Sequence, residues 1–164
     1  MFGKQGINVK EMGKILNDWV YKSVKQIFFN ERELARCGLK KIDDVFYELN
    51  SAFSFIVIDS VTKAGFYRKQ NIIDEMHNQN IEMLINSKYI ASDETIDYRR
   101  CLSQTYKENY KIMKKDEWMK ELARAILERT EGQYEDEKAV SIFESNLVEF
   151  CKNTIELLKK HREK

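Results

Sequence analysis

Apolar residues recur at intervals of three and four along most of this chain, which is the spacing of one face of an α-helix. Six segments carry the pattern, and they span residues 9–37, 41–64, 67–89, 92–115, 116–132 and 140–161. Asn30 and Glu33 have the spacing of a capping box, which predicts a kink or break near residue 30. The pattern therefore predicts a compact bundle of five to six helices with short connections.

The absence of proline from all 164 residues strengthens the helical prediction. Proline interrupts helix interiors because it lacks a backbone donor and clashes with the preceding turn. A chain of this length can bury about 70% of its unfolded surface, so it needs no disulfide or metal to fold. We predict a single all-α domain over residues 1–164 with more than roughly 60% helix. Residues 1–8 and 162–164 are expected to lie loosely outside the bundle.

The segment 41–64 is apolar on nearly every side in its middle, which is typical of a helix surrounded by other helices. Its residues 53–59, with the sequence FSFIVID, also have the aromatic and β-branched composition of a buried strand. The helical period runs through them without a break, and no second strand is available to pair with them. We therefore predict that this segment is the central helix.

Polar residues and glycines mark the predicted helix ends. Ser92 is followed by two acids and is an N-cap candidate, as is Asp116. Gly38 is placed for a left-handed C-cap, and Gly132 ends the fifth segment.

The last segment carries an apolar stripe wider than a single neighbouring helix would cover. One row of the stripe contains Val140, Leu147 and Phe150, and a parallel row contains Ile155 and Leu158. An apolar patch beyond a few hundred Å² is rarely left open to water. We expect these five residues to form an interaction face, used with another protein or in a symmetric homodimer.

The overall charge and the cysteines place the chain in a broad class. The formal net charge is +1, so no global field attracts the chain to nucleic acid or to a membrane surface. The three cysteines, Cys37, Cys101 and Cys151, include no C-x-x-C pair and predict free thiols in a reducing cytoplasm. Cys101 and Cys151 adjoin apolar stripes, where buried cysteines are expected.

No uncharged run reaches the length of a membrane span. The abundance of Lys, Ile and Asn is typical of an AT-rich bacterial or phage genome.

Bases alternate with aromatic residues over 98–115, and this basic-aromatic face contains Arg99, Arg100, Lys107 and Lys111. Such a combination can stack on nucleobases and neutralise phosphates. At helical spacing, however, Tyr106 and Tyr110 share a face with Leu102, which predicts that their rings lie in the core and the bases outside. Nucleic acid is therefore not the expected partner.

The two histidines do not match a di-metal bundle, which needs two Glu-x-x-His pairs. His77 has Asp74 three residues before it, and it lies between Ile73 and Ile81 at helical spacing. We therefore interpret His77 as a partly buried structural residue. His161 has a leucine at the ligand position, so neither histidine is assigned to a metal.

Two pairs of acids have the spacing found in helical, magnesium-dependent nucleotide phosphohydrolases. These pairs are Glu128 with Glu131 and Glu94 with Asp97, but their order is reversed relative to that pattern. No nucleophile elbow and no glycine-rich phosphate loop occur. No catalytic residue, metal ligand or cofactor is assigned.

These observations predict a non-catalytic helical module of protein interaction or regulation in a bacterial or phage cytoplasm, not an enzyme. The alternative is a bundle that binds a small apolar ligand or effector, using the aromatic residues of 41–64 and 92–115. A metal-dependent nucleotide phosphohydrolase is the third hypothesis. An internal pocket favours the ligand hypothesis, inward carboxylates favour the enzyme, and a flat exposed apolar patch favours the interaction module.

Overall fold

Helices make up 83% of the residues in the computed structural model, which describes residues 8–27, 31–39 and 41–162 and contains no strand within them. Seven α-helices lie in these ranges: α1 (Val9–Lys22), α2 (Glu31–Arg36), α3 (Ile42–Ala64), α4 (Lys69–Asn86), α5 (Thr95–Ile112), α6 (Trp118–Arg129) and α7 (Glu137–Arg162). A π-helical turn, η1 (Ser23–Ile27), follows α1, and a 3₁₀ turn, η2 (Ser92–Glu94), precedes α5. The all-α prediction is confirmed.

The seven helices exceed the predicted five to six because the segment 9–37, where a break was predicted, contains two α-helices. The π-helical turn follows α1 directly, and the predicted break position near residue 30 lies outside the described residues. The proposed cap at Asn30 lies outside the described residues. Asn8, predicted to be loose, is the N-cap of α1, and its Oδ1 accepts a hydrogen bond from the Glu11 amide at 3.2 Å. Arg162 is likewise the last residue of α7.

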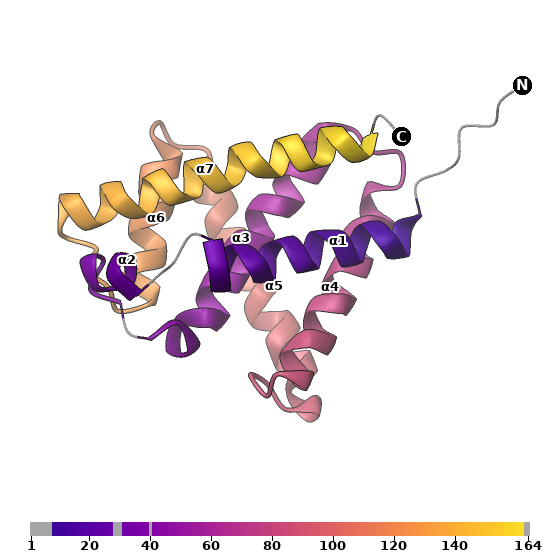
Figure 1. Cartoon of the computed structure of the whole chain (residues 1–164), viewed down its shortest axis with the longest axis horizontal. Helices are drawn as coiled ribbons and strands as arrows, with labels where there is room; N and C mark the ends of the chain where they lie inside the picture. The colour runs from indigo at the N-terminus through magenta and orange to yellow at the C-terminus, as the bar shows by residue number, and fades with distance from the viewer. Residues whose placement is uncertain (1–7, 28–30, 40, 163–164) are drawn as a thin grey trace, which may run out of the picture.

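The central helix is α3, as predicted. Every side chain from Ser51 to Ile58 is buried, which places the FSFIVID sequence inside the helix and rules out the strand interpretation. Helices α1, α4, α5, α6 and α7 all contact α3. Figure 1 shows α1 and α7 running lengthwise across the molecule, with α3 crossing obliquely, while α4 and α5 form an arm that ends in their connecting loop.

The apolar stripe of α7 is buried within this chain, which corrects the predicted interaction face. Val140, Leu147 and Phe150 are 0% exposed, Leu158 is 2% exposed, and only Ile155 is exposed, at 42%. Helices α3 and α6 pack along α7, and α1 adds a third neighbour through Trp19.

The indole of Trp19 stacks on the Phe150 ring, with a centroid separation of 5.6 Å. Its Nε1 donates a hydrogen bond to Thr154 Oγ1 at 2.9 Å. Phe53 of α3 stacks on the same Phe150 ring, at 4.2 Å. The stripe is wide because three helices cover it, so its width does not indicate a second copy of the chain.

Left-handed residues end several helices. Gly38 (φ 66°) follows α2 as predicted, and Gly65 (φ 71°) caps α3. At the end of α6 the left-handed residue is Glu131, and Gly132 comes one position later. A Cβ atom on Gly132 would lie 2.8 Å from a methyl carbon of Leu39, so glycine is needed there for close packing.

Two predicted N-caps are replaced by their neighbours. Ala91 takes the N-cap position of η2, and its amide donates to the Glu94 carboxylate at 2.7 Å. Glu117, in a left-handed conformation, takes the N-cap position of α6 in place of Asp116. The start of α7 has a polar cap, since Asp136 Oδ1 accepts a hydrogen bond from the Lys138 amide at 2.9 Å.

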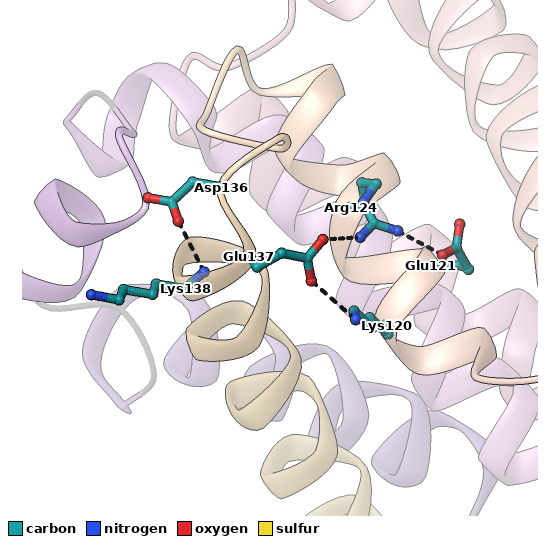
Figure 2. A network of polar contacts seen from close by, with 6 residues as sticks. All are labelled: Lys120, Glu121, Arg124, Asp136, Glu137 and Lys138. Atoms are coloured by element: carbon teal, nitrogen blue, oxygen red, sulfur yellow. Dashed lines mark hydrogen bonds and ion pairs between the residues drawn. The ribbon is translucent and has the colours of Figure 1, made fainter.

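An ion-pair network joins α6 to the start of α7 (Figure 2). The Glu137 carboxylate accepts from Lys120 Nζ at 3.0 Å and from an Arg124 nitrogen at 2.7 Å. Arg124 also reaches Glu121 at 2.6 Å. These bonds lower the pKa of Glu137, the hydrogen bond from Lys120 having the largest effect. The network therefore connects the first turn of α7 to α6 at the molecular surface.

Candidate functional site

The four predicted basic residues of α5 are all exposed, but they divide into two groups. Arg99 and Lys107 line a pocket between α4 and α5, whereas Arg100 and Lys111 do not. Positions 99, 103 and 107 recur every four residues and therefore share a helix face. Arg100 lies one residue away and is paired with Asp97 on its own helix at 3.4 Å.

The pocket has a volume of about 350 Å³. Helix α4 contributes His77 and Ile81, and α5 contributes Arg99, Leu102, Ser103, Tyr106, Lys107 and Tyr110. Its size falls in the range of small-molecule sites, which combine an apolar lining with a few convergent polar groups. Arg99, Lys107 and Tyr110 are exposed, so the mouth of the pocket is open to solvent.

The pocket exists because α4 and α5 each pack mainly against other helices. Helix α4 lies against α1 and α3, and α5 lies against α3 and α6. Helices α4 and α5 are joined to each other through side-chain hydrogen bonds. Near the connecting loop, Tyr98 Oη donates to Asn80 Oδ1 at 3.0 Å, and Arg99 donates to Asn78 Oδ1 at 3.1 Å.

Aromatic rings line one side of the pocket. The Tyr106 hydroxyl lies 3.3 Å from His77 Nε2, within hydrogen-bond distance, and the two rings are inclined by 29° with their centroids 5.9 Å apart. The Tyr110 ring makes a T-shaped contact with Phe55 of α3, with a centroid separation of 4.9 Å. Tyr106 is half-buried, but Tyr110 is 42% exposed, so the predicted core position is wrong for Tyr110.

Burial and charge set the ionisation of the two groups inside the pocket. Burial lowers the pKa of His77 below its ordinary value, the Arg99 guanidinium lowers it further, and Asp74 opposes the shift. Burial raises the pKa of Tyr106 well above its ordinary value. At neutral pH the pocket therefore contains a neutral imidazole and a protonated phenol, with two cations at its mouth.

The two cations at the mouth have no carboxylate partner within residues 8–27, 31–39 and 41–162. Arg99 donates to the amide oxygen of Asn78, which leaves its charge uncompensated. Lys107 makes no ion pair in the same ranges. An uncompensated cation beside an apolar surface favours a ligand that combines an anionic group with an apolar body.

The remaining candidate residues do not converge on another site. His77 is half-buried, as predicted. Over the part of the chain that the structure describes, no group of three or more His, Cys, Asp or Glu side chains is placed to hold a metal ion. Glu94 and Asp97 lie at the start of α5, and Glu128 and Glu131 at the end of α6.

The three cysteines are free and differ in exposure. Cys37 is buried, Cys151 is half-buried and Cys101 is exposed, so the prediction of a buried position is wrong for Cys101. Burial raises the pKa of Cys37 to about 11, and the nearby Glu33 adds to the rise. Burial also raises the pKa of Cys151.

No family model, curated protein or solved structure matches this chain. Among the described helices, none combines the length and the apolar character needed to cross a membrane.

Proposed function

We propose that this chain is a non-catalytic regulatory module that binds a small aromatic anion in the pocket between α4 and α5. The observation that carries the proposal is the position of Arg99 and Lys107 beside a surface built from Tyr106, Tyr110 and His77. Neither cation has a carboxylate partner in the part of the chain that the structure describes. A planar ring fits against the aromatic wall, and a carboxylate or phosphate on that ring pairs with the cations.

The structure supports this proposal better than the interaction face expected from the sequence. That face required Val140, Leu147, Phe150 and Leu158 at the surface, and all four are in the core. The large exposed apolar residues, Tyr67, Ile96, Tyr110 and Ile155, lie on α5, on α7 and in the α3–α4 connection. Within residues 8–27, 31–39 and 41–162, these four residues are divided among two helices and a connection and do not form the flat apolar patch that would favour a protein partner or a homodimer.

Binding, rather than proton transfer, suits the two ionisable groups inside the pocket. His77 and Tyr106 lie within hydrogen-bond distance of each other, and the raised pKa of Tyr106 keeps it a phenol at neutral pH. A phenol and a neutral imidazole orient a ligand through hydrogen bonds, while Arg99 and Lys107 supply the charge.

Calorimetric titration with matched probes tests the proposal. The probes are 2-naphthoate with its neutral analogue 2-naphthylmethanol, and adenosine monophosphate with adenosine. We expect the anion of each pair to bind more tightly than its neutral analogue. The double variant Arg99→Gln, Lys107→Gln should lose about tenfold or more in affinity, because a charge-assisted hydrogen bond contributes about 1.5–3 kcal/mol.

The control is the double variant Arg100→Gln, Lys111→Gln, which removes the same charge from the same helix outside the pocket. It should bind the probes like the wild type. Equal losses in both double variants would show a general charge effect and would contradict the proposal. So would affinity that rises with the length of a single-stranded oligonucleotide, because this result indicates nucleic-acid binding along α5.

A further inference from the structure

A second cleft, about 290 Å³ in volume, lies where the C-terminal halves of α3 and α7 meet the start of α6. Its apolar lining includes Trp118 of α6 and Ile155 and Leu158 of α7. Leu158 is buried and Trp118 is half-buried, whereas Ile155 is 42% exposed. The exposed side of the Ile155 side chain therefore forms part of one wall of the cleft.

Cations outnumber acids among the described residues that line this cleft. These cations are Lys63, Lys159 and Arg162, and the acid within the same described ranges is Asp59. Lys63 is paired with Asp59 at 2.7 Å, and Lys159 with Glu156 at 3.1 Å. Arg162 makes no ion pair with another residue of the ranges that the structure describes, so among these residues no carboxylate competes with a ligand for its guanidinium.

We propose that this cleft binds an aliphatic carboxylate, with the chain on Ile155, Leu158 and Trp118 and the carboxylate on Arg162. The guanidinium can hold a carboxylate through two parallel hydrogen bonds. The aliphatic side chains of Ile155 and Leu158, together with an arginine that has no ion pair among the described residues, distinguish this site from the pocket between α4 and α5. The site does not depend on the function proposed for that pocket.

Cys151 lines the cleft and reports its occupancy directly. It is half-buried, and burial raises its pKa, so its alkylation should be slower than that of an exposed thiol and can be followed by mass spectrometry. Cys101 is exposed on α5 and serves as an internal reference in the same molecule. The experiment measures the rates of iodoacetamide modification at both cysteines while decanoate is added below its micelle concentration.

We expect decanoate to slow the alkylation of Cys151 in a saturable way and to leave Cys101 unchanged. Decylamine, which reverses the charge, and butyrate, which shortens the chain, should protect Cys151 much less. Arg162→Gln should raise the half-protecting decanoate concentration about tenfold or more, because it removes the charge-assisted hydrogen bonds of the guanidinium. Lys152→Gln, an exposed position on α7 outside the cleft, is the matched control and should behave like the wild type.

Equal protection by decanoate and decylamine would overturn the proposal, because it shows an apolar surface without charge selection. A wild-type dimer in sedimentation, with Cys151 protected before any decanoate is added, would also overturn it in favour of a second copy on Ile155. Neither outcome would contradict the function proposed for the α4–α5 pocket.

Discussion

Asn50 and Asn80 form a reciprocal pair of hydrogen bonds in the core of this bundle. Asn50 Nδ2 donates to Asn80 Oδ1 at 3.1 Å, and Asn80 Nδ2 donates to Asn50 Oδ1 at 3.0 Å. Asn80 Nδ2 also donates to Asn17 Oδ1 at 2.9 Å, and its Oδ1 accepts from Tyr98. One buried amide therefore links α1, α3, α4 and α5 and fixes their relative register.

Replacement of Asn80 should destabilise the fold strongly. Asn80→Ala leaves the polar groups of Asn17, Asn50 and Tyr98 buried without that partner, at a cost of about 1–3 kcal/mol for each unsatisfied group. We expect a total loss of about 3–5 kcal/mol, measured by urea unfolding. Asn71→Ala, an exposed position on the same helix, should change stability by less than about 0.5 kcal/mol. A similarly small change for Asn80→Ala would mean that the network does not hold the helices together.

Gly13 allows α1 to approach α4 closely. A Cβ atom at this position would lie 2.6 Å from Glu75 Cγ and 3.0 Å from the backbone carbon of Glu75. Alanine improves helix propensity by about 1 kcal/mol, but forced overpacking costs about 1–3 kcal/mol, and the backbone carbon cannot move aside. Gly13→Ala should therefore destabilise the fold by up to about 2 kcal/mol in urea unfolding, while the exposed Lys14→Ala stays near the wild type. A stabilised Gly13→Ala variant would show that α1 is farther from α4.

The variant Leu147→Glu tests whether Leu147 lies in the core of one chain or in a dimer interface. Leu147 is 0% exposed, so a glutamate there would place an unpaired charge in the core of α7. We expect the variant to lose more than about 4 kcal/mol and to unfold, as seen by circular dichroism. Ile155→Glu, at the exposed position of the same predicted face, should remain helical. A helical, monomeric Leu147→Glu variant of a dimeric wild type would restore the interaction face predicted from the sequence.

His77 should make stability depend on pH near neutrality. Its pKa is lowered in the folded state, mainly by burial and then by Arg99, with Asp74 opposing. The unfolded chain therefore binds more protons in the window from the ordinary value of 6.5 down to the folded value. Stability is fully present above this window and decreases as the pH falls through it. His77→Gln should flatten the pH dependence of the urea-unfolding free energy in that window. An unchanged pH dependence would show that His77 is exposed to solvent.

Local sequence patterns predicted most of the helices because each depends on a period within one segment. The apolar run of α3 and the left-handed Gly38 are of this kind, and both are confirmed. The role of the α7 stripe was not predictable in this way. A row of apolar residues does not reveal how many neighbouring helices cover it. One of the residues that cover the stripe is Trp19, which lies 135 residues before its hydrogen-bond partner Thr154 in the sequence.

The candidate pocket contains two of the four residues of the basic-aromatic face predicted from the sequence. The alternation of bases and aromatic residues identified Arg99 and Lys107, but it also included Arg100 and Lys111, which lie outside the pocket. His77 was missed as their neighbour because it comes from another helix. His77 and Tyr106 are 29 residues apart in the sequence, and the α4–α5 connection brings them together. The spacing of residues within one segment does not predict the geometry of that connection.

The measurement that tests the proposed site most directly is an NMR titration of the His77 imidazole, with and without saturating adenosine monophosphate. In the free protein we expect a pKa below 6.5, because burial and Arg99 disfavour the imidazolium. An anion bound on Arg99 and Lys107 offsets that charge, so the bound protein should show a higher His77 pKa, while adenosine should leave it unchanged. The signal is assigned with His77→Gln. A His77 pKa that stays the same with saturating nucleotide would contradict the account, since the ligand would then occupy a different part of the molecule.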